Sequence, residues 1–296
     1  MSTSVSTSFV TAYSAKLQDL FQRQGSMLRP TVTRADNVVG SSHVFQTIGK
    51  GAATTKARHG TITPMNQTHA APSATLEDFY AGDWSDKLDE SKQSVNQQDA
   101  LARGGAFALG RKVDDQIIVI LNSTSESTST LTTSTIGNAR GGLLTLVKLL
   151  DANDVPNDGM RYGLLTPNMW AIAMAIPEFT SSDFVTAEGR PYITGAPGFR
   201  TFANWMGVKW GVHTALPGVG TTAANIYVYH SDSLGYATGA SVNNMAAVDG
   251  VAADITWHGD RAAFFVNHMM SGGGALIDTT GIIEGLVVDT TAVPTS

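Results

Sequence analysis

A long segment near the start of the chain has too few apolar residues to fold on itself. From Thr31 to Ala74 it consists mostly of Thr, Ser, Gly, Ala, Asn, His and basic residues. Its large apolar residues are Val32, Val38, Val39, Val44, Phe45, Ile48, Ile62 and Met65. So little apolar surface cannot offset the conformational entropy that is lost when a segment becomes ordered. The segment is either a flexible tail or an arm that becomes ordered on a neighbouring subunit, and the rest of the chain favours the arm.

The composition excludes several classes of protein. The 296 residues are 42% hydrophobic, which is enough for one large domain or two modest ones. The chain has no cysteine, so disulfides and Cys-based zinc sites are excluded. No apolar run approaches the ~20 residues that cross a bilayer, and Met1 to Ser8 lacks the pattern of a signal peptide. We therefore expect no membrane partner, and a protein made and used in a cytoplasm or in a particle assembled there.

Charge is distributed unevenly along the chain, although the net charge of −6 argues against nucleic acid as a ligand of the whole surface. The basic residues before position 61 include Lys50, Lys56 and Arg58. The acidic residues between positions 75 and 100 include Glu77, Asp78, Asp83 and Asp86. These two stretches could pair within one chain or between chains. They could equally be two solvated faces, since exposed ion pairs contribute only ~0–1 kcal/mol each.

Hydrophobic spacing predicts the elements around the arm. Phe9, Tyr13 and Leu17 fall on one stripe of an amphipathic helix from about Phe9 to Gln24, which is short enough to need a partner surface. The arm itself predicts a hairpin with strands at 44–50 and 61–65 and a loop at 51–60. A long helix is expected from about 86 to 121, with acidic residues in its first turns and a bend or close packing point at Gly104 and Gly105.

The later part of the chain alternates between helices and strands. Residues 123–135 read as a Ser/Thr-rich connector, and 138–150 as a helix. A buried strand at 162–165 precedes a helix that Thr166 caps, that Pro167 begins and that Pro177 ends. Further strands are predicted at 208–212, 226–229, 262–270 and 275–288, with a hairpin turn at the glycines 272–274.

No motif of an active site is present. The seven histidines lack the spacing of a zinc protease, and no nucleophile elbow, phosphate-binding loop or dinucleotide fingerprint occurs. His59 and His69 lie on the polar arm, where a solvated histidine is expected rather than a metal ligand. His258, Asp260 and Arg261 read as a polar cluster. We predict no catalytic residue, no metal ligand and no cofactor, and this profile indicates a structural subunit.

The order of four motifs resembles the major capsid proteins of tailed bacteriophages with the HK97-like fold. The motifs are FQRQGSMLR at 21–29, HGTITP at 59–64, ALGRKVDD at 108–115, and YGLLTPNMW at 162–170 followed late in the chain by GGGALID at 272–278. This resemblance covers most of the chain. It implies an α+β fold with an N-arm at 1–40, an E-loop at 41–85, and a P-domain at 86–160 whose spine helix covers about 86–121. An A-domain at 161–254 follows, and 255–296 return to the P-domain.

The resemblance also implies a function. It implies a structural subunit of an icosahedral head that self-assembles into hexamers and pentamers and encloses double-stranded DNA without sequence-specific contact. Separate scaffolding, portal and decoration proteins would be further partners, and assembly would take place in the host cytoplasm. No Lys–Asn cross-link is predicted, because Lys50 and Lys56 lack a recognisable partner. The candidate inter-subunit contacts are Phe9, Tyr13, Leu17, Lys50, Lys56, Arg58, Glu77, Asp78, Asp83 and Asp86.

Two other functions are compatible with the same sequence. The chain could be an enzyme in which residues 31–74 form a long lid over a site, or a structural protein of a phage tail or tube. Electron microscopy distinguishes the three by showing icosahedral shells, small oligomers or tubes.

Overall fold

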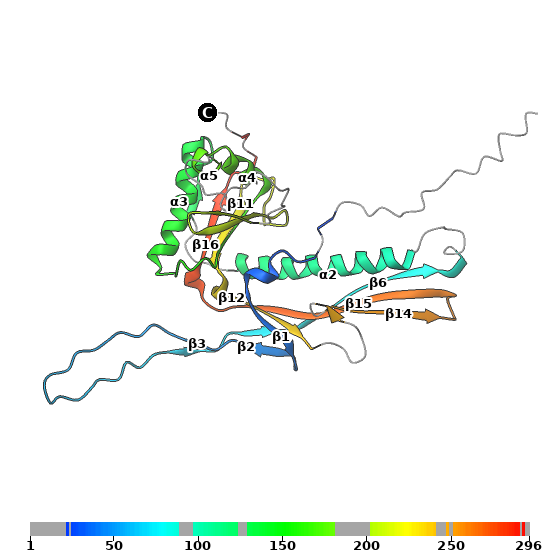
Figure 1. Ribbon diagram of the computed structural model, residues 1–296, viewed down its shortest axis with the longest axis horizontal. Helices are drawn as coiled ribbons and strands as arrows, with labels where there is room; N and C mark the ends of the chain where they lie inside the picture. Colours follow the sequence, from blue (N-terminus) through cyan, green and yellow to red (C-terminus); the bar gives the residue numbers. More distant parts are fainter. Residues whose placement is uncertain are drawn as a thin grey trace, which may run out of the picture. The chain divides into compact units, whose positions relative to one another are not determined.

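The computed structural model describes residues 22–23, 25–88, 97–123, 129–180, 202–240, 247–248, 251–290 and 292–293. The chain forms two compact units (Figure 1), each made of separate stretches of sequence. The first unit comprises Met1–Ser26, Asp78–Lys112 and Ala240–Ser271. The second comprises Met27–Glu77, Val113–Gly239 and Gly272–Ser296. Helix α2 (Gln97–Asn122) and strands β6 (Glu77–Asp86) and β15 (Ala263–Leu276) contribute residues to both.

The second unit contains a six-stranded mixed sheet with the order β7-β16-β11-β8-β10-β9. The strands are β7 Ser129–Leu131, β8 Arg161–Leu165, β9 Phe202–Trp205, β10 Val208–Val212, β11 Ala224–His230 and β16 Ile282–Val287. β8 is parallel to β10 and antiparallel to β11, and all its residues are buried, as is typical of a central strand with both faces covered. The strands predicted at 162–165, 208–212 and 226–229 are confirmed. β7 lies where only a connector was predicted.

Three helices belong to this sheet: α3 (Ile136–Ala152), α4 (Pro167–Met174) and α5 (Pro177–Thr180). α3 packs on β7, β16 and β11 and against α4 (Figure 1). The Thr166 hydroxyl accepts the Met169 N–H and Pro167 opens the helix, so the predicted start of α4 is confirmed. Pro177, predicted only to end a helix, also begins α5, because proline is well suited to a first helical turn. The buried core of this unit includes Leu143, Leu146, Ile172, Trp210 and Ile283.

The second unit also contains a smaller set of strands near the chain start. β1 (Thr33–Val38) pairs parallel with β12 (Leu234–Gly239), and β12 pairs antiparallel with the end of β15. Short 3-10 helices connect these parts: η2 Arg29–Thr31, η3 Ser231–Ser233 and η4 Thr279–Gly281. The β1–β12 pairing brings residues about 200 positions apart in sequence into register.

The glycines at 272–274 lie inside strand β15, and the hairpin turn predicted there is wrong. A Cβ on Gly273 would meet the Thr75 carbonyl oxygen at 1.9 Å, and one on Gly274 would meet the Ile120 side chain at 2.0 Å. A Cβ on Gly272 would meet the Tyr236 hydroxyl at 2.4 Å. The glycines therefore allow close packing on a continuous strand, which is a recognised use of glycine inside strands.

The first unit combines the N-terminal part of α2 with strands β6, β13 (Ala247–Val248), β14 (Val251–His258) and the first residues of β15. β14 pairs antiparallel with both β13 and β15, and β6 also pairs with β15. Alternate residues of β15, among them Val266, His268 and Met270, are buried. α2 lies on this face, because Gly105 stands directly against the His268 ring.

Two of the predicted helices lie partly or mostly outside the described residues. The predicted helix at 9–24 falls almost entirely outside the described residues, apart from Gln22 and Arg23, which are not helical. The long helix is present as α2, but Asp86, predicted in its first turn, ends strand β6 instead, and residues 89–96 lie outside the described ones. Ser85 is buried and its neighbour Asp86 is exposed, which is the alternation of a strand and not the pattern of a helix.

The neighbouring glycines of α2 give a matched pair of substitutions. A Cβ on Gly105 would meet the buried His268 ring at 2.3 Å, whereas a Cβ on Gly104 would meet nothing within 4 Å. Gly104→Ala should raise the free energy of unfolding by up to about 1 kcal/mol, because alanine is the better helix former. Gly105→Ala should lower it by about 1–3 kcal/mol through overpacking. Urea unfolding of the unassembled subunit measures both, and equal shifts of the same sign would contradict this packing.

Candidate assembly surfaces

The hairpin between residues 42 and 75 contains a long exposed stretch of the second unit. β2 (Ser42–Val44) pairs with β5 (Ser73–Thr75), and β3 (Thr47–Ile48) pairs with β4 (His69–Ala70). Every residue from 50 to 71 is exposed. The predicted second strand at 61–65 is wrong. Pro64 has no backbone N–H to donate to a neighbouring strand, and Asn66, with a φ of 43°, interrupts the extended backbone. We call residues 51–68 the hairpin tip.

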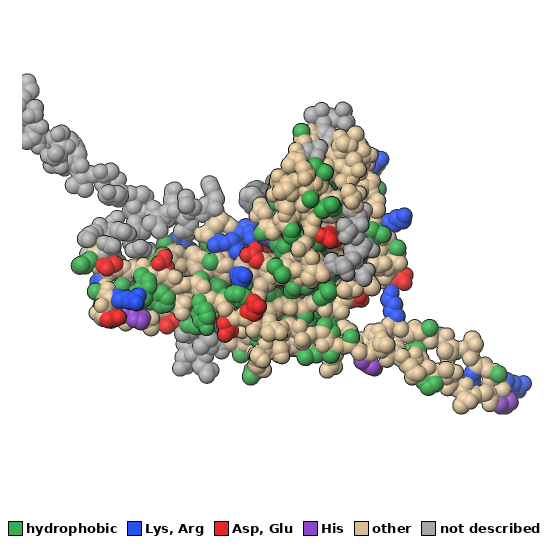
Figure 2. Space-filling view, turned by 180° about the vertical axis from the view of Figure 1, so that it is seen from behind, with side chains coloured by type: hydrophobic (Ala, Val, Ile, Leu, Met, Phe, Trp, Pro, Cys, Tyr) green, Lys and Arg blue, Asp and Glu red, His purple; other side chains and the backbone are tan. Residues whose placement is uncertain are grey.

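The hairpin carries basic side chains and no acidic ones. The sequence contains no Asp or Glu between Asp36 and Glu77, so Lys50, Lys56 and Arg58 have no acidic neighbour in the hairpin. In Figure 2 the hairpin, at the lower right, shows basic and histidine side chains at its end and no acidic ones on the face in view. Among the described residues, Lys56 and Arg58 form no ion pair; the Lys56 ammonium donates to the Gly60 carbonyl at 3.3 Å.

Phe45 anchors the base of this hairpin. Its ring packs with Ala74, Ala237 and Ala275, and a Cβ on Gly235 would lie 2.6 Å from it. The Phe45 N–H donates to the Pro72 carbonyl at 2.8 Å, which holds the two hairpin strands together at this point. One aromatic side chain in a socket of small residues thus fixes an otherwise polar hairpin to the core of the unit.

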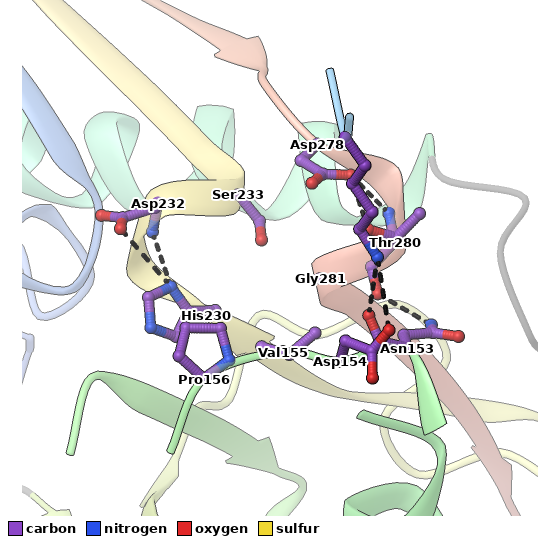
Figure 3. A pocket seen from close by; sticks show the side chains of 11 residues that line it. Asn153, Asp154, Val155, Pro156, His230, Asp232, Ser233, Asp278, Thr280 and Gly281 are labelled. Carbon is purple, nitrogen blue, oxygen red and sulfur yellow. Dashed lines mark hydrogen bonds and ion pairs between the residues drawn. The ribbon is translucent and has the colours of Figure 1, made fainter. Parts of the chain in front are cut away.

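A polar pocket of about 250 Å³ lies beside the hairpin base (Figure 3). Lys50 reaches across it, donates to the Asn153 carbonyl at 3.4 Å and lies 3.8 Å from the Asp154 carboxylate. Both side chains of this ion pair are largely exposed, so it contributes little to stability. Lys50, proposed from the sequence as an inter-subunit contact, therefore has a partner within its own chain.

His230 forms one wall of the pocket and is held by two hydrogen bonds. Its Nδ1 accepts the Asp232 N–H at 3.2 Å, so its Nε2 is the donor to Asp158 at 3.1 Å. The Met160 N–H and then His230 hold the pKa of Asp158 below its ordinary value. The His230–Asp158 bond joins the end of β11 to the loop before β8.

Asp114 of α2 is fully buried and fixes the start of the second unit. Its carboxylate accepts the Met27 N–H at 3.1 Å and the Leu28 N–H at 3.0 Å. His213 Nδ1 accepts the Ala215 N–H, so His213 Nε2 is the donor to Asp114 at 3.3 Å. Asp114 was not among the sequence-predicted sites. The available signal was that Asp114 follows Val113, an apolar residue of the predicted helix face.

A second carboxylate secures strand β1. Asp36 accepts hydrogen bonds from Arg29 at 3.0 Å and from Thr238 at 2.9 Å. Burial alone would raise the pKa of Asp36, but the bonds from Thr238 and Arg29 and the charges of Arg29 and Arg34 outweigh it and hold the pKa below its ordinary value. Asp36 therefore stabilises the fold in its ionised form.

Strand β6 presents the acidic residues that the sequence singled out. Glu77, Asp78, Asp83 and Asp86 are all exposed, and none forms an ion pair with another described residue. Asp83 accepts the Trp84 N–H and Asp86 accepts the Leu88 N–H, so both also shape the local backbone. The remaining sequence-predicted contacts, Phe9, Tyr13 and Leu17, lie outside the described residues.

The residues that the structure describes show no group of three or more His, Asp or Glu side chains placed to hold a metal ion. None of the helices in that part of the chain is long and apolar enough to cross a membrane. His258, Asp260 and Arg261, predicted as a polar cluster, lie at the turn between β14 and β15. His258 Nδ1 lies 4.0 Å from an Asp260 carboxylate oxygen, and the Arg261 guanidinium stacks on the Trp84 ring.

Comparison with known proteins gives a consistent result. Residues 5–289 match the family described as phage capsid protein. No curated protein matches the sequence. A structure from Mycobacterium phage Che8 is 18% identical, with a TM-score of 0.68 over 94% of this chain and 97% of that one.

Two further solved structures share the fold. The capsid of cyanophage P-SCSP1u is 14% identical, with a TM-score of 0.71 over 98% of this chain and 96% of that one. The capsid of a native GTA particle is 12% identical, with a TM-score of 0.71 over 97% of both chains. At these identities the likeness shows a common HK97-like fold of the α+β class, as predicted from the sequence.

The lowered pKa of Asp36 predicts how the free energy of unfolding changes at acid pH. Because its folded-state pKa lies below the ordinary value of 3.8, its contribution is present above that value and is lost as pH falls through the folded pKa. Asp36→Asn should lower the free energy of unfolding at neutral pH and flatten its fall below about pH 4. Urea titrations of the unassembled subunit at several pH values measure this, with Asp260→Asn as the control. An unchanged acid slope would contradict the assignment.

Proposed function

Because this chain belongs to the phage capsid protein family and is a structural subunit of a phage head, we propose that its copies close into hexamers and pentamers of an icosahedral shell. The observation that carries this proposal is the basic, acid-free hairpin, exposed from residue 50 to 71. An element with so little apolar surface gains order chiefly from a partner. A neighbouring copy supplies that partner in a closed shell.

We divide the subunit along the lines that the resemblance implies. The N-arm is 1–40, the E-loop 41–85, the P-domain 86–160 with α2 as its spine helix, and the A-domain 161–254, with 255–296 returning to the P-domain. The shared core of Leu143, Leu146, Val228 and Ile283 supports one change, in which α3 and β16 also belong to the A-domain. The phage capsid family membership favours a shell protein over an enzyme with a lid at 31–74 and over a tail or tube protein.

The packaged molecule in this proposal is double-stranded DNA, held without sequence-specific contact. A net charge of −6 supports this, because clustered cations on an inner surface would bind phosphates tightly through counterion release. Scaffolding, portal and decoration proteins are proposed as separate partners, and assembly as taking place in the host cytoplasm. In this proposal a subunit outside the shell binds duplex DNA weakly.

Electron microscopy of the purified chain tests the proposed function. Closed shells with five-fold and six-fold clusters of subunits are expected at high protein concentration. Discrete small oligomers would support a non-shell protein, and open tubes would support a tail component. Either result would overturn the proposal.

We predict that the charge of the hairpin tip is required for assembly. Lys56→Glu with Arg58→Glu should block or strongly retard shell formation, because the tip would then repel exposed carboxylates such as Asp78 and Asp83 of a neighbour. The circular dichroism of the subunit should not change, since both positions are exposed. Light scattering across a salt series measures assembly, and high salt should weaken the wild-type contact as the Debye length falls from about 10 Å to about 3 Å.

The control for this experiment is Lys148→Glu, which reverses an exposed lysine on α3. Lys50 is left unchanged because it contacts Asp154. Normal assembly of the double reversal would show that the tip is held by backbone bonds or remains solvated.

A further inference from the structure

Tyr80 is an exposed aromatic residue whose side chain has no partner among the residues that the structure describes. The residue is 67% exposed on β6, and its side chain takes part in no hydrogen bond, ring contact or cation contact with another described residue. Strand alternation places Tyr80 on the same face of β6 as Asp78, Gly82, Trp84 and Asp86. All five are exposed, whereas the opposite face contains the buried Ser85. This face of β6 is an aromatic surface flanked by carboxylates.

Three aromatic rings on or beside β6 each hold a cation. Within the first unit, the Lys112 ammonium lies 5.0 Å from the Phe79 ring centre, and the Lys87 ammonium lies 5.0 Å from the Phe264 ring centre. The Arg261 guanidinium lies 4.5 Å from the Trp84 ring centre. The surroundings of β6 thus favour cations over rings, and Tyr80 is the ring on this strand that lacks one.

The hairpin tip presents a cation suited to this ring. The Gly60 N–H donates to the Ala57 carbonyl at 2.9 Å, which closes a tight turn with Arg58 at its first central position. His59 has a φ of 69°, and the Lys56 ammonium bonds to the Gly60 carbonyl, so the turn is held from both sides. Arg58 is exposed and forms no ion pair among the described residues. It projects from a fixed corner in a hairpin without acids.

We infer that Arg58 of one copy stacks on Tyr80 of a second copy, with Asp78 beside it. This inference rests on the proposed function, and it adds the residues that make the contact specific. A guanidinium stacks on an aromatic face and bonds a carboxylate in the same plane, whereas an ammonium does not combine the two. Charge complementarity identifies the occupant: no carboxylate lies in the hairpin, and none of the carboxylates of β6 has a cation among the described residues.

The contact predicts a pattern among substitutions at Tyr80. Tyr80→Phe should assemble like the wild type, because it keeps the ring. Tyr80→Ser should raise the protein concentration needed for shell formation about 2- to 5-fold, which is the change in affinity that corresponds to one exposed cation–π contact. Arg58→Ala should have a similar effect. The variant with both changes should be no worse than the stronger single variant, because the two residues share one interaction. Additive effects, or a loss in Tyr80→Phe equal to that in Tyr80→Ser, would overturn the inference.

Chemical cross-linking tests the contact independently of shell formation. The chain has no cysteine, so one population with Ala57→Cys and another with Glu77→Cys, which both keep Arg58 and Tyr80, can be mixed without background reaction. A short bismaleimide should yield the mixed 57–77 dimer in excess over a 148–77 dimer made with Lys148→Cys. Absence of that excess overturns the inference whether or not shells form. Cross-linking without closed shells would overturn the proposed function and leave the inference standing.

Discussion

The hydrogen bonds of the buried Asp114 carboxylate are the interaction on which the start of the second unit depends. A charge without contact to water is costly unless hydrogen bonds replace the lost hydration. Here two consecutive backbone N–H groups, from Met27 and Leu28, and the His213 ring provide those bonds. One side chain therefore joins helix α2, the segment before β1 and the end of β10. The same segment is held further along by the Thr31 hydroxyl, 2.6 Å from the buried Tyr229 hydroxyl.

This anchoring explains how a polar hairpin can be part of a stable subunit. Once residues 27–31 are fixed, β1 pairs with β12, and the chain enters the hairpin from a defined position. Phe45 then fills a socket of small residues, and the glycines of β15 allow the Thr75 backbone to cross closely over the strand. Apolar packing is concentrated at the hairpin base. The hairpin tip can therefore remain polar without destabilising the core.

The sequence predicted the elements whose signals are local. Thr166 and Pro167 start α4 by capping chemistry that involves only neighbouring residues, and the apolar run at β8 is buried on both faces. Elements that depend on distant contacts were missed. The glycines at 272–274 read as a turn because the residues that need the space, Thr75 and Ile120, lie far away in sequence. β7 pairs in parallel with β16, about 150 residues later, and nothing in its Ser/Thr-rich surroundings indicates this.

The candidate site was predicted only in part, for the same reason. The uneven charge was visible in the sequence, and the exposed carboxylates of β6 agree with it. The partner of Lys50 was not visible, because Asp154 comes close to it only through the packing of the hairpin base. Asp114 was missed because an acid on a helix is expected to be solvent-exposed, and the sequence does not show that the backbone of Met27 and Leu28 covers it. The exposure of Tyr80 follows from strand alternation, which required knowing that residues 77–86 form a strand and not the start of a helix.

The absence of carboxylates from the hairpin has a consequence for the symmetry of association. Two such hairpins brought tip to tip repel each other, because each carries only cations. A two-fold, isologous pairing through this element is therefore disfavoured. The contact that remains is heterologous, in which the hairpin of one copy meets a different surface of the next. Repeated around an axis, a heterologous contact leads to a closed ring or to an open helix, according to its rotation. The charge of one hairpin thus gives the association a direction, and ring closure then depends on the rotation between neighbouring copies.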